Sequence, residues 1–470
     1  MVARLLLALS LTGSVSASSL ASTYSFNPLR HLAGIAPYFE PHDPPASPDA
    51  PQGCTADRAA YLVRHAAIYA SNFDFKEYLK PFFEKLENKS SSVDWKKVPY
   101  LNFLDDWSPP VSDDDLFSLT RLGRLQATKL GVDLDFRYPG IKAPKKVWAS
   151  SVERTVKSAQ SFVRGLQPDD GDVEVISIDE STESGANSLT PHKACPAYSK
   201  SAGSEEATVY QEIYAKPIAA RLNDLVPDFN FTISDVFSMQ QLCGYETVIR
   251  GKSPFCSTEL FTPDDWLGWE YSEDIRYHYN AGYGFPAAGY IGVPWLNATA
   301  SLLLDNHNDG DDLLVSFTHR ELIPMVMVAM GVFNNSQFSG ANNINDTLPL
   351  DRINYRREWK SSHFVSFLSN VAIERFNCTN SYGYDDGEYY RVLVNSAPQA
   401  LPSCTDGPGT TCSRNAFEEY VQRRVEMLSG FSDKCGVEYG NSTDTLSIYT
   451  NSSVGTKVKE DKRYIANFGS

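Results

Sequence analysis

Beyond its first residues the sequence has no long hydrophobic segment, and its net charge is not basic. The longest apolar candidate, residues 322–333, has 12 residues, whereas a membrane-spanning helix needs roughly 18 or more. The 470 residues carry a formal charge of −16, which disfavours binding to the phosphate backbone of nucleic acids. We therefore expect neither a nucleic-acid partner nor a membrane partner.

Several sequence motifs of common hydrolases and redox proteins are also absent. There is no G-x-S-x-G, no H-E-x-x-H and no C-x-x-C, so a serine hydrolase, a zinc protease and a thioredoxin-type site have no support. Gly251-Lys252-Ser253 resembles part of a phosphate-binding loop, but Glu246 stands where that loop begins with glycine. We predict no metal and no other cofactor.

The N-terminus is typical of a signal peptide, residues 1–17. Arg4 precedes the apolar run Leu5 to Leu11, and Val15-Ser16-Ala17 offers small residues for cleavage. Residues 18–53, rich in Ser, Pro and Ala, are predicted to form an extended arm. We expect a secreted, extracellular protein.

The cysteines and the glycosylation sequons agree with a secretory route. Eight cysteines, an even number, favour disulfides, and spacing alone suggests two local bridges, Cys243–Cys256 and Cys404–Cys412, without pairing the other four. The N-x-S/T sequons, each a candidate surface acceptor, are at Asn88, Asn230, Asn297, Asn334, Asn345, Asn377, Asn441 and Asn451.

Short apolar strands alternate with helical segments, which predicts an α/β fold. Strands are expected at 61–63, 147–150, 313–317 and 389–395, and helices at 74–89, 119–131, 152–166 and from 322. Residues 167–304 carry few clean strands and are predicted to be a mainly helical insertion, between α/β segments 54–166 and 305–470. No internal repeat is evident.

Polar residues follow three of the predicted strands. Arg64-His65 follows the first, Ser150 and then Arg154 the second, and His319-Arg320-Glu321 the third. In a parallel sheet these ends would share one edge and one pocket. The set suits phosphoryl transfer, because a neutral imidazole can attack phosphorus, arginines bind phosphate, and a carboxylic acid can protonate the leaving alkoxide.

These segments resemble the histidine acid phosphatases, the branch 2 histidine phosphatases, and in particular their secreted fungal phytases. The resemblance covers about residues 54–437. Its RHGxRxP loop appears as Arg64 to Ala70, its LT-x-x-G-x-x-Q helix as Leu119-Thr120, Gly123 and Gln126, and its late histidine motif as residues 317–321. The segment 149–156 corresponds to the region of a further phosphate-binding arginine.

The resemblance implies a phosphoglycerate-mutase-like α/β sandwich with an inserted helical lobe. It implies His65 as nucleophile, Glu321 as proton donor, and Arg64, Arg154 and His319 as ligands of the transferred phosphate. It also implies the disulfide framework Cys54–Cys378, Cys195–Cys435, Cys243–Cys256 and Cys404–Cys412. The expected partner is a small anionic substrate, a phosphomonoester, with inositol phosphates such as phytate among the candidates.

The loop departs from the family pattern at Ala66, Ile68 and Ala70. Ile68 stands where the family has a second arginine, and loss of one charged hydrogen bond costs roughly 1.5–3 kcal/mol. We hypothesise that Arg320 replaces that donor. The alternatives are a weakly active relative that only binds an anionic ligand, and an enzyme repurposed for a non-phosphate substrate, for example in fungal secondary metabolism.

Other lysines and histidines are expected to be structural or exposed to solvent rather than catalytic. Lys76, Lys80, Lys85 and Lys89 recur along one segment. They would suit a basic rim for phytate, but a solvated helix face is the favoured interpretation. The remaining histidines with no partner spacing are predicted to be structural or exposed: His192, His278, His307 and His363.

Overall fold

A central sheet organises the chain. The computed structural model describes residues 26–41, 44–89, 92–166, 173–306, 310–335 and 343–459, so the predicted signal peptide lies outside the described residues. Within these ranges nine strands form one sheet, in the order β7-β6-β5-β1-β4-β2-β3-β9 with β8 beside β6. Their bounds are β1 (Cys54–Arg64), β2 (Lys146–Ser150), β3 (Glu174–Ile178), β4 (Leu313–Thr318), β5 (Asn370–Cys378), β6 (Gly387–Val394), β7 (Ala397–Gln399), β8 (Cys412–Ser413) and β9 (Thr456–Lys457).

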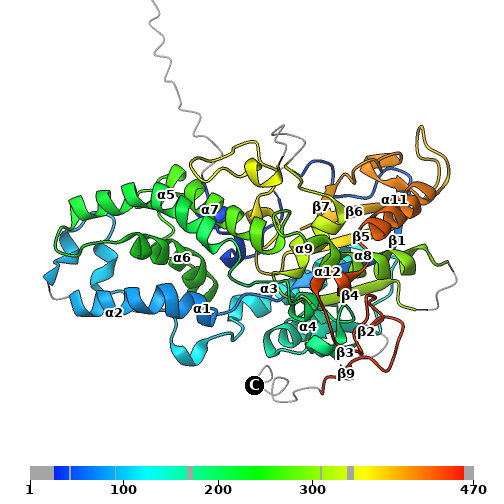
Figure 1. Cartoon of the computed structure of the whole chain (residues 1–470), viewed down its shortest axis with the longest axis horizontal. Coiled ribbons are helices and arrows are strands. Elements are labelled where there is room, and N and C mark those ends of the chain that lie inside the picture. The colour runs from blue at the N-terminus through cyan, green and yellow to red at the C-terminus, as the bar shows by residue number, and fades with distance from the viewer. Residues whose placement is uncertain are drawn as a thin grey trace, which may run out of the picture.

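Helices cover the sheet and form a lobe beside it, which lies on the left in Figure 1. The described helices are α1 (Asn72–Asp74), α2 (Lys80–Lys89), α3 (Arg121–Arg137), α4 (Glu153–Leu166), α5 (Ser204–Leu225), α6 (Ile233–Arg250), α7 (Pro263–Ala281), α8 (Ala288–Leu304), α9 (Leu322–Met330), α11 (Arg414–Met427) and α12 (Phe431–Cys435). A π-helical turn, Phe75–Leu79, joins α1 to α2. No described helix is long and apolar enough to cross a membrane.

The two faces of β1 belong to different layers of the core. Tyr61 and Val63 pack in the cluster that contains Phe162 of α4, whereas Ala60 and Leu62 pack in the cluster that contains Leu322 of α9. Successive side chains of a strand point to opposite faces of a sheet, so β1 is buried between two helical layers. The predicted α/β sandwich with a helical lobe is confirmed.

Parallel pairing brings the ends of three strands to one edge. β4 lies parallel between β1 and β2, with Arg64 opposite Thr318 and Ala149 opposite Phe317. The expected convergence of these ends is therefore present. β5 runs antiparallel to β1, and β6 runs antiparallel to β5. The strand predicted at 389–395 therefore has the same direction as β1 but is separated from it by β5.

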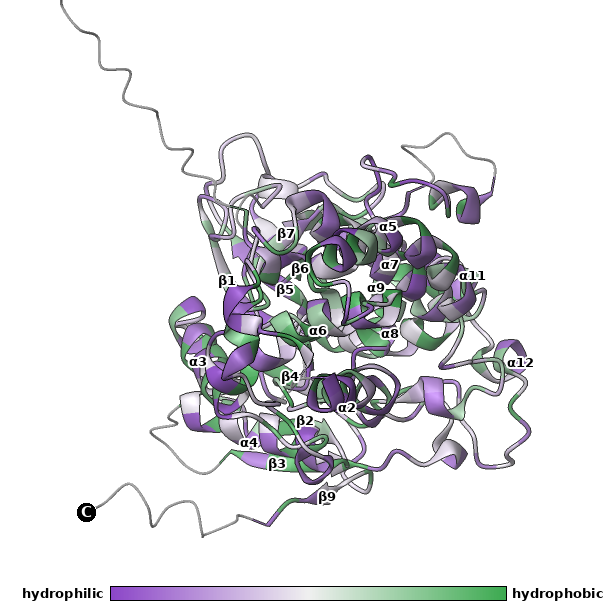
Figure 2. Cartoon of the chain, turned by 90° about the vertical axis from the view of Figure 1, so that its left-hand side faces the viewer, coloured by the Kyte–Doolittle hydropathy of each residue, from purple (hydrophilic) through white to green (hydrophobic). Residues whose placement is uncertain are grey.

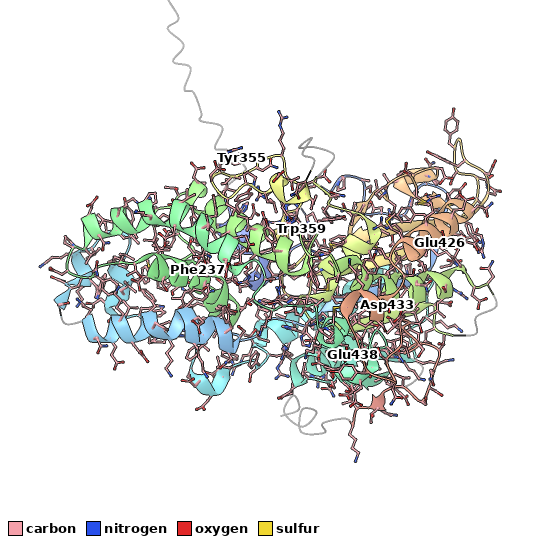
Figure 3. The ribbon with its side chains drawn as sticks, in the orientation of Figure 1. Phe237, Tyr355, Trp359, Glu426, Asp433 and Glu438 are labelled. Atoms are coloured by element: carbon pink, nitrogen blue, oxygen red, sulfur yellow. A yellow bond between two sulfur atoms is a disulfide. The ribbon has the colours of Figure 1, made fainter. Side chains whose placement is uncertain are left out.

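The helical lobe has an aromatic interior and a charged exterior. Phe237 of α6 points into this interior (Figure 3), with its ring 4.3 Å from that of Trp269 and 4.7 Å from that of Tyr78. Helix α2 is mostly purple in Figure 2 because most residues of its sequence KPFFEKLENK are hydrophilic, and of these ten residues only Phe82 is buried. Its polar face is therefore on the outside.

The packing does not follow the predicted boundaries at 167 and 304. β3 lies within 167–304 but pairs with β2 in the sheet, and α8 packs against α9 and β1. Conversely, the π-helical turn before α2 lies within 54–166 but packs against α6 of the helical lobe. The sequence pattern did not predict that segments of each region pack in the other one, because the contacts join segments far apart in the chain.

Four disulfides tie the chain together, and they are the four pairs implied by the family resemblance: Cys54–Cys378, Cys195–Cys435, Cys243–Cys256 and Cys404–Cys412. The first two close loops of 324 and 240 residues. The first joins neighbours across β1 and β5, and the second ties the segment after β3 to the end of α12.

The sequons differ in exposure. Asn88, Asn230, Asn377, Asn441 and Asn451 are exposed, whereas Asn297, Asn334 and Asn345 are partly buried. The side-chain oxygen of Asn345 also lies 3.0 Å from Nε2 of the buried His278. This last asparagine is a poor glycosylation acceptor as it stands.

Candidate active site

A pocket opens at the sheet edge where β1, β2 and β4 end. Its walls combine cationic, aromatic and acidic side chains from both lobes: Arg64, His65, Ile68, Ser71, Asp74, Phe117, Arg154, Lys200, Tyr245, His319, Arg320, Glu321 and Phe367. All six residues predicted for chemistry or phosphate binding are in this set. We therefore treat the pocket as the candidate active site.

His65 is buried at the pocket floor with one ring nitrogen engaged. Nδ1 lies 2.9 Å from the carbonyl oxygen of Ala66, and a carbonyl only accepts, so Nδ1 carries the proton. This leaves Nε2 unprotonated, which is the state a nucleophile needs. Burial, followed by the charges of Arg64 and Arg154, lowers the pKa of His65 well below its usual value, so the imidazole stays neutral in mildly acidic solution.

The loop after His65 is fixed by the start of α3 and by α4. Thr120 caps α3 by accepting from the Gly123 N–H, and its own N–H donates to the Ala67 carbonyl at 2.9 Å. A Cβ on Gly123 would stand 2.4 Å from that same carbonyl oxygen. The glycine of the LT-x-x-G motif is therefore required by the close approach of the loop. Ser158 Oγ accepts from the Ala66 N–H.

Arg64 is held by hydrogen bonds from its Nη1, and its Nε has no hydrogen-bond partner among the described residues. Its Nη1 donates to the carbonyl oxygens of Gly34, at 2.6 Å, and Val365, and its guanidinium carbon lies 4.3 Å from the centre of the Phe367 ring. Nε is buried without a hydrogen-bond partner among the described residues. Burial lowers the pKa of Arg64 to about 10, so it remains a cation able to bind an anion.

The second predicted histidine, His319, is held between a cation and an anion. Arg154 Nη2 lies 3.1 Å from its Nδ1, and because arginine only donates, Nδ1 is the acceptor. Nε2 therefore carries the proton and donates to Glu180 Oε1 at 2.7 Å. Burial opposes ionisation of Glu180, but its interactions with His319 and Lys193 outweigh the burial, and the pKa of Glu180 falls to about 2.

Arg320 and Glu321 form an ion pair at the pocket wall, with Nε 3.3 Å from Oε1. Arg320 lines the pocket together with Ile68, and within the described residues its two Nη groups make no hydrogen bond. It therefore has the donors that the missing second arginine would supply. Burial favours the protonated form of Glu321, but the charge of Arg320 above all outweighs it, so the pKa of the carboxyl lies well below its usual range.

Several residues of the site were not predicted from the sequence, among them Ser71, Phe117, Lys200 and Phe367 of the pocket lining. Four more have a clear role in the site. They are Glu180 beside His319, Gly34 of the arm beneath Arg64, and the pair Asp74 and Tyr245. Tyr245 donates to Asp74 Oδ2 at 2.6 Å. The predicted helical segment at 74–89 contained Asp74, but nothing in its spacing marks it as a pocket residue. Gly34 is forced by packing, since a Cβ there would lie 2.4 Å from the Tyr277 hydroxyl.

The lysines considered for a basic rim do not line the pocket. Lys80 pairs with Asp113, Lys85 with Asp235, and Lys89 donates to the Asp228 carbonyl. The favoured interpretation, a solvated helix face, fits these contacts. Among the other histidines, His192 is buried near Glu321, His278 is buried, His363 is exposed, and His307 lies outside the described residues.

Comparisons with known proteins agree with this geometry. Residues 57–395 match the model of the histidine phosphatase superfamily (branch 2). The chain is 32% identical to an acid phosphatase of Komagataella pastoris over 431 residues, 88% of this chain and 87% of the relative, and 29% identical to a phytase of Candida albicans, over 90% and 89%.

Solved structures of phytases and inositol polyphosphate phosphatases also match this chain. The phytase from D. castellii superposes with a TM-score of 0.82 at 26% identity, covering 96% of this chain and 97% of that one. The multiple inositol polyphosphate phosphatase of Bifidobacterium longum, in complex with phosphate, shares the fold, with a TM-score of 0.60 at 14% identity over 83% and 97%. With the family model spanning most of the chain, the protein belongs to the histidine phosphatase superfamily, branch 2.

Proposed function

We propose that this protein hydrolyses phosphomonoesters through a phosphohistidine on His65. The observation that carries the proposal is the hydrogen bond from His65 Nδ1 to the Ala66 carbonyl, which leaves Nε2 unprotonated among three arginines. The activities printed for the Komagataella pastoris and Candida albicans relatives support it.

In the first step, Nε2 of His65 attacks phosphorus and the bond to the ester oxygen breaks. Arg64, Arg154 and Arg320 bind the phosphate oxygens and neutralise the charge as it redistributes. His319, held by Glu180, accepts from Nη2 of Arg154 and orients that guanidinium toward the phosphate. The alcohol needs a proton as it leaves, and Glu321 is the carboxyl group at hand.

The low pKa of Glu321 means that this carboxyl is ionised before substrate binds. A phosphomonoester has a second pKa of about 6, so in acid solution it arrives as a monoanion that carries a proton. The bound phosphate interacts with the Arg320 guanidinium and repels the Glu321 carboxylate. Both effects raise the pKa of Glu321. The proton then passes through Glu321 to the ester oxygen.

In the second step, water attacks the phosphohistidine. Glu321, now ionised, accepts a proton from that water, the N–P bond breaks, and Nε2 keeps its electron pair. Glu321 passes this proton to the new phosphate, inorganic phosphate leaves as the monoanion, and the enzyme returns to its first state. Each step is a displacement at phosphorus with one proton transferred.

The experiment that tests this function compares two leaving groups. p-Nitrophenolate leaves without a proton, whereas the alkoxide of glycerol 2-phosphate requires one. We expect Glu321→Gln to lower kcat/KM, which reports the formation of the phosphohistidine, by roughly 100-fold or more for the glycerol ester and much less for p-nitrophenyl phosphate. His65→Ala should abolish turnover of both, and the exposed His363→Ala, outside the pocket, should change neither.

Equal losses on both esters in Glu321→Gln would remove Glu321 from the role of proton donor. Full activity in His65→Ala would remove the phosphohistidine itself. Failure of the correctly folded wild-type protein to hydrolyse either ester would favour the alternative of an anion-binding relative without turnover.

We further propose that the protein is secreted and glycosylated. The four disulfides support an oxidising compartment, and the exposed Asn88, Asn230, Asn377, Asn441 and Asn451 are the acceptors that exposure favours. Removal of N-glycans with a glycosidase, followed by intact-mass measurement of the protein from culture medium, tests both statements. An unglycosylated protein retained in the cells would contradict them.

A further inference from the structure

Phe117 stands at the pocket in an unfavourable backbone conformation. Its φ is 63°, the left-handed region that bulky side chains rarely occupy, and its side chain is 41% exposed. Strained residues of this kind persist only where the surroundings impose them, and they gather at functional sites.

The loop that follows His65 imposes this conformation. The Phe117 N–H donates to the Ala70 carbonyl at 2.9 Å, and the Tyr69 N–H donates to the Ser118 carbonyl at 3.0 Å. Two backbone hydrogen bonds thus tie the aromatic residue to the segment that carries the nucleophile. The ring is positioned relative to His65 by the main chain rather than by a flexible loop.

The ring lies between the phosphate-binding groups and solvent. The guanidinium carbon of Arg154 is 5.3 Å from its centre, and Arg154 in turn contacts His319. Among the residues that line the pocket, Phe117 and Lys200 are the exposed ones. The alcohol portion of an ester whose phosphate is bound beside His65 therefore extends toward Phe117 and Lys200, and Phe117 is the aromatic one of the two.

The charge of the pocket wall suits a substrate with one phosphate. Apart from Arg64, Arg154 and Arg320, which the proposed mechanism commits to that phosphate, Lys200 is the lining cation, and Asp74 adds a carboxylate. A substrate with several phosphates carries about −1.5 to −2 on each of them. One ammonium group cannot compensate such a charge.

We propose that Phe117 is a specificity-determining residue that selects phosphomonoesters of planar aromatic alcohols over polyphosphorylated ones. The ring packs against the face of the leaving group while the phosphate lies against His65. This inference rests on the proposed phosphomonoesterase function and narrows its substrate class. It requires nothing of Lys76, Lys80, Lys85 or Lys89, which do not line the pocket.

The test compares Phe117→Gly with a matched control, Tyr100→Gly. Tyr100 also has a φ of 63° and is 48% exposed, but it does not line the pocket. In each variant kcat/KM is measured for 1-naphthyl phosphate, glycerol 2-phosphate and inositol hexakisphosphate, together with the inhibition constant of inorganic phosphate and the Tm.

In wild type we expect kcat/KM to be highest for the naphthyl ester. Loss of one aromatic contact corresponds to roughly a twofold to tenfold change, so Phe117→Gly should lower the naphthyl-to-glycerol ratio by that factor. Glycine relieves the strain at φ 63°, so the Tm should be equal or higher. Inhibition by phosphate should be unchanged, and Tyr100→Gly should leave the ratio as in wild type.

An unchanged naphthyl-to-glycerol ratio in Phe117→Gly overturns the inference, and so does a wild-type kcat/KM for inositol hexakisphosphate above that for the naphthyl ester. A loss of Tm with the loss of selectivity overturns it too, since the ring would then be a packing residue. Phe117→Asn, which tolerates positive φ, repeats the measurement if the glycine variant does not fold. Hydrolysis without selectivity leaves the proposed function standing, whereas absence of all hydrolysis removes both.

Discussion

The Nε2 atom of His319 lies 2.7 Å from Oε1 of Glu180, while Nδ1 of the same ring lies 3.1 Å from Nη2 of Arg154. The two contacts fix one tautomer and one orientation of the imidazole. Glu180 follows β3, and His319 follows β4. The His319 side chain is thus held by Glu180, which follows β3, and by Arg154, which follows β2.

Glu180 is accordingly expected to act as a positioning residue for His319. Glu180→Ala should lower kcat/KM by about 10- to 100-fold, by analogy with the loss found when the outer partner of a metal-ligating histidine is removed. Glu180→Gln, which keeps an acceptor oxygen, should lose less. Steady-state kinetics and phosphate inhibition measure both effects, and the inhibition constant of phosphate should rise in the alanine variant.

The control for this prediction is Lys193→Ala, which removes the other partner of Glu180 but leaves its carboxylate beside His319. Lys193 is 40% exposed, and exposed ion pairs contribute about 0–1 kcal/mol. We expect a change of less than about fivefold. Equal losses in Lys193→Ala and Glu180→Ala would show that the carboxylate acts through general stability instead.

Arg320 is expected to supply the phosphate donor that Ile68 lacks. Arg320→Ala should cost about 1.5–3 kcal/mol of transition-state stabilisation, about a 10- to 150-fold loss in kcat/KM. The double variant Ile68→Arg with Arg320→Ala should recover part of that loss, because both positions line the pocket. Measuring kcat/KM of the two single variants and of the double variant gives the coupling energy between positions 68 and 320. Unchanged activity in Arg320→Ala would show that Arg320 does not take the place of the missing second arginine.

Gly123 is expected to matter for the nucleophile loop. In Gly123→Ala the new Cβ would stand 2.4 Å from the Ala67 carbonyl oxygen and 2.8 Å from its nitrogen, so the segment after His65 must move. We expect a destabilisation of about 1–3 kcal/mol and a loss of activity larger than the loss of folded protein. Gly140→Ala, where no atom lies within 4 Å of the new Cβ, is the control and should show neither effect.

His278 is expected to make stability depend on pH. It is fully buried, and burial lowers its pKa to about 4, against about 6.5 in the unfolded chain. Between these values the unfolded state binds the extra proton, so this contribution is complete above pH 6.5 and is lost as pH falls toward 4, by about 3 kcal/mol. Urea unfolding at pH 7 and pH 4 measures it. In His278→Gln the fall should shrink by that amount, and an equal fall in both proteins would exclude His278 as its source.

Much of the site could be predicted from the sequence because strand ends carry it. Arg64-His65 and His319-Arg320-Glu321 each follow an apolar strand directly, and parallel pairing of β1 and β4 then brings them together. The disulfide framework came from the family resemblance, since spacing alone reached only the two local pairs.

The missed residues lie where no periodicity exists. Glu180 follows β3, which the sequence placed inside a helical insertion, and Gly34 belongs to the arm before β1. Asp74 is on an α-helix of three residues continued by a π-helical turn. Their roles depend on tertiary contacts, which join Gly34 to Arg64 across 30 residues, Glu180 to His319 across 139 and Asp74 to Tyr245 across 171. Local sequence pattern does not record such contacts.

The proposed mechanism requires a covalent phosphohistidine intermediate on His65. The most direct measurement mixes the enzyme with a rapidly hydrolysed phosphomonoester, quenches it in alkali, where phosphohistidine survives, and locates the added phosphoryl group by peptide mass spectrometry. We predict one phosphoryl group on the peptide containing His65, absent from His65→Ala. A phosphoryl group on another residue, or turnover by His65→Ala at the wild-type rate, would contradict it.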